Sequence, residues 1–278
     1  MFKKLFVSGL TVLLASVSFA STTVTAQDEN VLRVASHLPP MTDVVELAGE
    51  AIAEPYSVEL VEVTDNIQYN EALLNDEVIA SFAQHEPFME MFNEERDGDL
   101  VAIQPIYNAV VGFYSPTYET VDEIEEGAEV AIPSDPTNEA RALLILQDQG
   151  LLTLDEEAGF FATVEDITDN PLNLEFEHID LLNLTAAYED GYDLVFNYPT
   201  YIASIDLTPA DAIFLEDESD NTFAIQLVVR EGNVDSDEIK ALQAAFTSQE
   251  VYDFLSELEA EGHLRPAFDM EDTAEDQE

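Results

Sequence analysis

The chain has 278 residues, with 60 acidic residues against 8 lysines and arginines and no cysteine, so its net charge at pH 7 is −52. This charge opposes nucleic-acid binding, which requires a basic surface, and it would be repelled by anionic lipid headgroups. The lack of cysteine excludes disulfides, thiolate metal sites and a cysteine nucleophile. A hydrophobic content of 46% is that of a globular protein, and the length allows two domains. Because the acids repel one another at low salt, we expect a halophilic protein that works in a saline environment.

Residues 1–26 are predicted to be an export signal peptide. Lys3 and Lys4 precede an uncharged apolar run at residues 5–20, and small residues suit cleavage after Ala20 or Ala26. The run is short for a membrane span, so we expect no integral membrane protein, although a signal retained as an anchor is the alternative. Without cysteine the mature N-terminus cannot carry a cysteine-linked lipid. We therefore expect an exported protein of the periplasm, cell envelope or extracellular space, not lipid-anchored through cysteine.

Strands and helices are predicted to alternate along the chain. The first half gives strands at 32–36, 56–63 and 78–82 and helices at 43–53 and 70–75. The second half gives strands at 174–178, 194–196 and 223–230 and helices at 136–150, 184–189, 236–246 and 248–261. This order is typical of α/β folds with parallel strands and crossover helices.

The pattern predicts two α/β lobes with a ligand cleft between them. Residues 27–115 together with 224–270 are assigned to lobe one, and residues 116–223 to lobe two. Residues 271–278 are predicted to be an acidic, disordered tail.

The segment at residues 132–147 (IPSDPTNEARALLILQ) is the most informative one. Asp135 is a good helix N-cap, and Pro136 suits the first helical position, where no N–H is needed. Arg141 lies in the early part of this helix, where the helix dipole disfavours a cation. Its planar guanidinium could hold a ligand carboxylate. An ion pair with one of the many protein acids is an equally open reading.

Polar side chains also follow two predicted strands. Gln84 and His85 come after a strand that contains Phe82, where open α/β sheets place ligand groups. His85 could line an apolar pocket or act as a structural hydrogen-bonding group. Asn197 follows the strand at 194–196 and could bind an amino acid or simply form a turn before Pro199.

Five tyrosines are candidates for pocket walls, although a place in the core explains any one of them better than a ligand contact does. They are Tyr69, Tyr107, Tyr114, Tyr198 and Tyr201. The four histidines show no metal-binding spacing, so no metal or other cofactor is predicted. No nucleophile elbow, phosphate loop or H-E-x-x-H motif occurs, and we predict that the protein is not an enzyme.

Together these motifs resemble the NlpA family of methionine-binding lipoproteins, the substrate-binding components of methionine ABC importers. Residues 132–143 (IPSDPTNEARAL) resemble the family pattern V-P-N-D-P-T-N-x-G-R-A-L, which includes Asn138. Residues 83–88 (AQHEPF) resemble F-Q-H-K-P-Y, residues 196–203 (FNYPTYIA) resemble I-N-x-x-Y-A, and Tyr114-Ser115 resembles the family's Y-S. The resemblance runs over residues 32–268.

The resemblance implies a two-lobed periplasmic-binding-protein fold that closes on its ligand. It implies that Arg141 holds the ligand carboxylate, that Asn197 helps to hold its amino and carboxyl groups, and that His85 sits beside the side chain. The partners it implies are methionine or a similar amino acid and an ABC permease, with the protein itself a monomer.

Besides the missing cysteine, four departures from the family pattern matter for the pocket. Ala83 replaces an aromatic residue, Asn66 replaces a tyrosine, Met41 replaces a histidine and Ala140 replaces a glycine. The clamp for an α-amino acid is kept while side-chain pocket positions have changed. Methionine is the predicted ligand, with another apolar amino acid or a short Met-containing peptide as the alternative.

Two other classes of function remain open. One is an exported hydrolase of small peptides or amides, with His85 as base and Asp135 orienting it. The other is a binding protein that serves as a sensor or adhesin rather than in transport.

Overall fold

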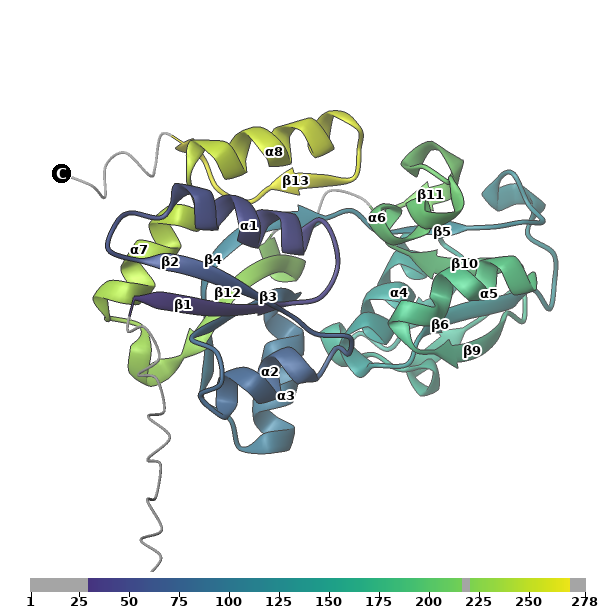
Figure 1. Ribbon diagram of the computed structural model, residues 1–278. Coiled ribbons are helices and arrows are strands. Elements are labelled where there is room, and N and C mark those ends of the chain that lie inside the picture. The colour runs from purple at the N-terminus through teal and green to yellow at the C-terminus, as the bar shows by residue number, and fades with distance from the viewer. Residues whose placement is uncertain (1–29, 217–220, 271–278) are drawn as a thin grey trace, which may run out of the picture.

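The computed structural model describes residues 30–216 and 221–270 (Figure 1). The export signal predicted at residues 1–26 and the tail predicted at residues 271–278 lie outside the described residues. The described residues form two sheets of five or more strands, each with its own helices. The predicted α/β class with two lobes is confirmed.

The first sheet has six strands. In spatial order they are β13 (Leu264–Pro266), β4 (Leu100–Ala109), β12 (Ala224–Arg230), β3 (Ala80–His85), β1 (Val31–Ser36) and β2 (Ser57–Glu62). β1 pairs in parallel with β2 and β3, whereas β12 runs antiparallel between β3 and β4. β12 follows the second lobe in the chain, so the first lobe is completed only when the chain returns to it.

Five helices belong to the first sheet. They are α1 (Met41–Ala51), α2 (Gln68–Leu74), α3 (Glu86–Arg96), α7 (Asp237–Phe246) and α8 (Gln249–Ala260). Figure 1 shows α1 and α8 on one side of the sheet and α2 and α3 on the other. Helix α3 is absent from the elements predicted from the sequence, although Phe88, Met89 and Phe92, all of which are buried, recur at helical spacing on one face.

The second sheet has five strands. In spatial order they are β11 (Ala212–Leu215), β5 (Gly112–Tyr114), β10 (Leu194–Asn197), β6 (Glu129–Pro133) and β9 (Glu175–Ile179). A two-stranded ribbon of β7 (Thr153–Leu154) and β8 (Ile167–Asp169) lies outside it. The helices are α4 (Pro136–Asp148), α5 (Leu184–Asp190) and α6 (Pro199–Ile202).

Several short 3-10 helices lie in the connections between these elements. Those that matter below are η2 (Gly159–Phe161), in the second lobe, and η7 (Asn221–Phe223), which leads directly into β12.

The chain crosses between the two sheets twice. It leaves the first sheet at the end of β4 and enters the second at β5, and it returns between β11 and β12. The sequence analysis assigned residues up to 115 to lobe one, but β5 pairs with β10 and β11 of the second sheet. We therefore propose a first crossing at residues 110–111. Below, the first lobe means the first sheet with its helices, and the second lobe the second sheet with its helices.

Within residues 30–216 and 221–270, no helix combines the length and the apolar character that crossing a membrane requires.

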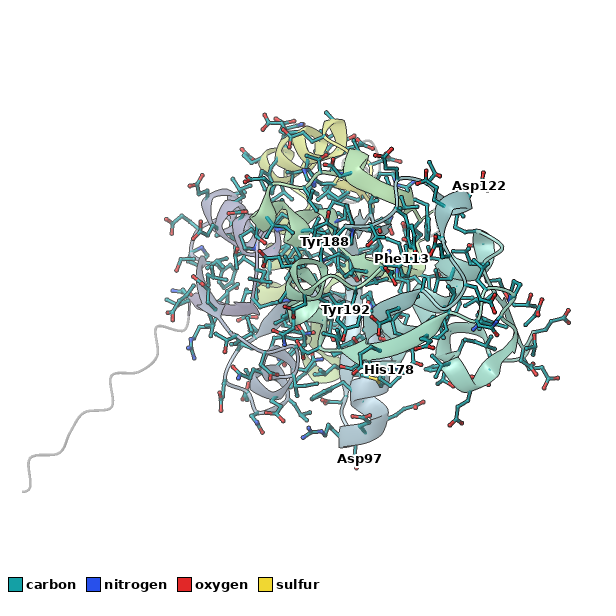
Figure 2. All side chains as sticks on the ribbon, turned by 90° about the vertical axis from the view of Figure 1, so that its right-hand side faces the viewer. Asp97, Phe113, Asp122, His178, Tyr188 and Tyr192 are labelled. Atoms are coloured by element: carbon teal, nitrogen blue, oxygen red, sulfur yellow. The ribbon has the colours of Figure 1, made fainter. Side chains whose placement is uncertain are left out.

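Acidic side chains cover the surface of both lobes. Figure 2 shows their oxygen atoms around the outline of the molecule, with Asp97 and Asp122 at its edge. Few cations oppose them, and three of these form surface ion pairs: Arg33 with Glu59, Arg96 with Glu71, and Arg230 with Asp76. Most surface carboxylates therefore face like charges, and their repulsion is reduced only by dissolved cations.

We expect the midpoint of thermal unfolding to rise as a chloride salt is increased from roughly 0.1 M to about 2 M, because salt screens repulsion between exposed charges. Circular dichroism would follow the unfolding. Sucrose at matched osmolality is the control, since it favours the compact state without screening charge. Equal midpoints at low and high salt would contradict the halophilic interpretation.

Candidate functional site

A cavity of about 40 Å³ lies between the two lobes. The first lobe supplies His37, Met41, Asn66, Tyr69, Ala83, Gln84, His85, Phe88, Tyr107, Ala109 and Ile225, and the second lobe supplies Asn138, Leu181, Tyr198, Thr200 and Tyr201. Aromatic and hydroxyl-bearing side chains dominate this lining. None of these residues is an Asp, Glu, Lys or Arg, although the chain has 60 acids.

His85 is placed by the start of a helix. It ends β3 and is the N-cap of α3, where its Nδ1 accepts a hydrogen bond from the Phe88 N–H at 3.2 Å. An acceptor Nδ1 in a neutral ring leaves the proton on Nε2. Nε2 lies 3.3 Å from Oδ1 of Asn138 in the second lobe and can donate to it. Burial, reinforced by the charge of Arg141, lowers the pKa of His85 to about 3, which keeps the ring neutral.

Asn138 connects both lobes at the start of α4. Asp135 is the N-cap, as predicted, and its carboxylate accepts from the Asn138 backbone N–H at 3.0 Å and from the Asn138 side-chain amide at 3.0 and 3.1 Å. The amide nitrogen therefore points to Asp135 and the oxygen points away from it. That oxygen receives hydrogen bonds from the Tyr198 hydroxyl at 3.0 Å and from His85.

Arg141 lies behind the cavity and is already paired. Its Nε and Nη2 donate to the two carboxylate oxygens of Glu216 at 2.9 and 2.5 Å. Nη2 also donates to the Ala109 carbonyl at 2.9 Å, and Nη1 donates to the Tyr198 hydroxyl at 3.3 Å. The guanidinium carbon lies 4.6 Å from the ring centre of Phe223. The ion pair with a protein acid, one of the two readings open from the sequence, is what the structure contains.

The partners of Arg141 explain how so buried a charge is tolerated. The residue is only 1% exposed, and an unpaired buried cation would be very costly. Burial acts to lower the pKa of Arg141, but the charge of Glu216 and the hydroxyl of Tyr198 outweigh it, so the pKa is raised. Ala109 ends β4 and Glu216 follows β11, so the guanidinium ties α4 to both crossing segments.

A second hydrogen bond joins the lobes through His37. This residue directly follows β1, and its Nε2 lies 3.3 Å from the hydroxyl of Tyr201 in the second lobe. The imidazole stacks on Tyr69 with ring centres 5.7 Å apart. Burial lowers the pKa of His37 to about 4, so this ring is also neutral.

Gln84 faces a matching amide in the first lobe. Gln84 and Asn70 exchange hydrogen bonds of 2.5 and 2.7 Å, and both side chains are buried. The pair is fixed before any ligand arrives, because each amide satisfies the other.

Half of the site residues predicted from the sequence line the cavity. Those that do are His85, Gln84, Asn138 and Tyr201; those that do not are Arg141, Asn197, Tyr114 and Phe82. Arg141 still reaches the cavity wall through Tyr198.

The other three predicted residues have different surroundings. Asn197 donates to the Thr185 hydroxyl at 3.1 Å and accepts from the Tyr198 backbone N–H. Phe82 packs against Phe246 in the core of the first lobe, and Tyr114 is fully buried in β5. Their roles in ligand binding remain predictions.

The sequence analysis did not propose His37 as a site residue, and it could not choose among the tyrosines. A usable signal for His37 existed, because it follows β1 just as His85 ends the neighbouring parallel strand β3. The carboxyl ends of adjacent parallel strands meet at one edge of a sheet.

The geometry does not support the hydrolase alternative. Both nitrogens of His85 are engaged, one by the N–H of Phe88 and one by Asn138. Asp135 bonds Thr137 and Asn138 rather than His85, so no acid orients the imidazole as a base.

Comparisons with known proteins decide the family. The model of the NlpA lipoprotein family matches residues 32–268. The chain belongs to the NlpA lipoprotein family. This confirms the relationship that the sequence motifs indicated.

Three relatives illustrate the similarity. The probable D-methionine-binding lipoprotein MetQ of Vibrio cholerae is 35% identical over 84% of this chain and 87% of its own. A YaeC-family lipoprotein of Enterococcus faecalis is 46% identical, with a TM-score of 0.77 over 86% of this chain and 100% of that chain. A nutrient-binding protein of Burkholderia cenocepacia, solved bound to methionine, is 30% identical with a TM-score of 0.80, over 85% and 100% of the two chains. The predicted periplasmic-binding-protein-like fold agrees with these structures.

One expectation is corrected by these relatives. From the missing cysteine we expected a protein that is not lipid-anchored through cysteine, but the family and its curated members are named lipoproteins. The expectation rested on the cysteine count alone, and the names of these relatives contradict it.

Replacing His85 by asparagine should make stability less sensitive to acid. Wild-type His85 gains a proton on unfolding wherever the pH lies between its lowered pKa of about 3 and its ordinary value of 6.5, so stability falls as the pH drops below 6.5. This one group should cost the wild type roughly 2 kcal/mol between pH 6.5 and about pH 5. Asparagine is a favoured N-cap, so α3 keeps its start.

Denaturant unfolding of both proteins at about pH 7 and about pH 5 measures the effect. The many carboxylates titrate alike in both proteins. Only the difference between the two proteins in the stability that each loses on acidification therefore reports on His85. An equal loss of stability on acidification in the two proteins would show that His85 is not held neutral.

Proposed function

We propose that this protein is the substrate-binding component of an ABC importer and that it captures an amino acid, methionine being the best candidate, in the cavity between its lobes. The observation that carries the proposal is the cavity itself, which is closed by neutral side chains from both lobes. Relatives that are named D-methionine-binding lipoproteins, and one solved with methionine, support the choice of ligand.

The composition of the wall suits a ligand with one apolar and one polar end. Met41, Phe88 and Ile225 are apolar, whereas Asn138 and Tyr198 offer an oxygen and a hydroxyl. A thioether is polarisable and makes favourable contacts with aromatic rings, which this wall supplies in number.

Ligand entry requires the lobes to separate. A cavity of about 40 Å³ holds only about three water molecules. An amino acid is larger, so the site must open and widen to receive it. Two hydrogen bonds between cavity residues of opposite lobes, His85 to Asn138 and His37 to Tyr201, would break and re-form in a hinge motion about the crossing segments.

The alternative ligand, another apolar amino acid or a short Met-containing peptide, has support of its own. Of the four departures named above, three, Met41, Asn66 and Ala83, line the cavity. The fourth, Ala140, is buried in α4 and does not. The departures therefore concentrate where a ligand side chain would lie.

Calorimetric titration of the protein, unfolded and refolded in high salt to remove any carried ligand, should show saturable one-to-one binding of methionine. The D and L forms, the other amino acids and Met-containing dipeptides would be titrated in parallel. Binding of a different amino acid or a dipeptide instead would select the alternative ligand. The absence of heat with every compound would contradict the proposal.

Asn138→Ala should weaken methionine binding about tenfold to a hundredfold, because it removes the oxygen that Tyr198 and His85 share and leaves buried donors unpaired. Asn197→Ala is the matched variant: the same substitution in the same lobe, at a predicted site residue that does not line the cavity. We expect it to change affinity by less than about threefold. A larger loss of affinity in Asn197→Ala than in Asn138→Ala would support the role that the family resemblance implies for Asn197.

A further inference from the structure

Glu216 is the residue that most alters the electrostatics of the site. Its carboxylate accepts hydrogen bonds from both Nε and Nη2 of Arg141, a bidentate geometry in which the planar guanidinium matches a carboxylate. Its side chain is 13% exposed and that of Arg141 is 2% exposed, so water screens this pair weakly. Glu216 is held in place from behind, because its backbone N–H donates to the Val111 carbonyl at 2.7 Å.

Arg141 is the one buried cation among the described residues. The charge that it could offer a ligand is cancelled before a ligand arrives. The cavity wall carries no charged side chain, and Tyr198 stands between the cavity and Nη1 of the guanidinium. Asp135 is a further acid near the cavity, and its carboxylate is turned to the amide of Asn138. The buried cation beside the cavity therefore already has an acid of its own.

We infer that Glu216 sets the charge class of the ligand: by cancelling Arg141 it makes the site accept a zwitterionic amino acid and discriminate against a carboxylate that lacks an ammonium group. This inference rests on the proposed function and goes beyond it, because neither the cavity nor the family relationship assigns a role to Glu216.

The physical basis is the difference in net charge between two ligands of the same shape. When the site becomes more positive, the carboxylate of a zwitterion is bound more strongly and its ammonium group is bound more weakly. The two effects on its affinity therefore oppose each other. An anion only gains. Glu216 therefore acts through Arg141 as a positioning residue, since its carboxylate is directed to the guanidinium and it does not line the cavity.

The test compares methionine with its α-hydroxy acid analogue, in which a hydroxyl replaces the ammonium group. Glu216→Gln keeps an oxygen for Arg141 and removes one negative charge. The ratio of the two affinities, methionine over hydroxy acid, should fall at least tenfold in this variant relative to the wild type. Glu216→Asp, which keeps the charge, should retain most of the wild-type ratio.

Asp76→Asn is the matched control. It makes the same change in net charge by removing the carboxylate that pairs with Arg230, and neither residue lines the cavity. It should leave the ratio as in the wild type. A merely structural role for Glu216 would lower both affinities together and leave the ratio unchanged in Glu216→Gln, which would overturn the inference.

The wild type alone gives a second test that does not depend on the folding of any variant. It should bind methionine at least tenfold more tightly than the hydroxy acid, and equal or tighter binding of the anion would overturn the inference while leaving the proposed function intact. A wild type that binds neither compound contradicts the proposed function itself, and the inference falls with it.

Discussion

One of the contacts between the two lobes depends on the hydrogen bonds of a single side chain, that of Asn138. Its side-chain nitrogen donates to Asp135, which is also the N-cap of α4. The same carboxylate therefore caps the helix and fixes the direction of the amide. The oxygen then has one possible role, as an acceptor. His85 can serve as its donor because the start of α3 occupies the other ring nitrogen. Two helix N-termini, one in each lobe, thus orient the groups of this hydrogen bond.

The second constraint is the buried charge of Arg141. A chain without disulfides must hold its lobes by packing and by satisfied polar groups. Arg141 meets three polar groups, the carboxylate of Glu216, the carbonyl of Ala109 and the hydroxyl of Tyr198, and it packs on the face of Phe223. Ala109 and Glu216 lie at the two crossings of the chain. The residue that the family resemblance marks as a ligand clamp is therefore held by the protein's own groups at both crossing segments.

Features that are determined by residues close together in the chain could be predicted from the sequence. The cap at Asp135, the proline at the first helical position and the strand that ends at His85 follow from residues close together in the chain. Sequence reasoning could not find Glu216 as the partner of Arg141, because 75 positions separate the two and any of 60 acids could have served. The same limit applies to Asn197. A strand end predicts that a side chain lies near the edge of the sheet, but Thr185 and the next backbone N–H engage the amide of Asn197.

Helix α3 shows the opposite failure, in which a local pattern was present but weak. Phe88, Met89 and Phe92 lie on one buried face, and acids near them in the sequence, such as Glu90 and Glu94, are exposed on the other.

The neutral cavity can be understood from the acidity of the rest of the molecule. A surface of net charge −52 attracts cations and repels anions as they approach. A site whose wall was also acidic would compete for the dissolved cations that screen the surface, and a site with an uncompensated arginine would draw in nearby protein carboxylates. Pairing Arg141 with a dedicated acid, and lining the wall with histidines of lowered pKa, tyrosines and amides, avoids both. Hydrogen bonds to such neutral groups are screened by salt far less than the net charge of the surface is.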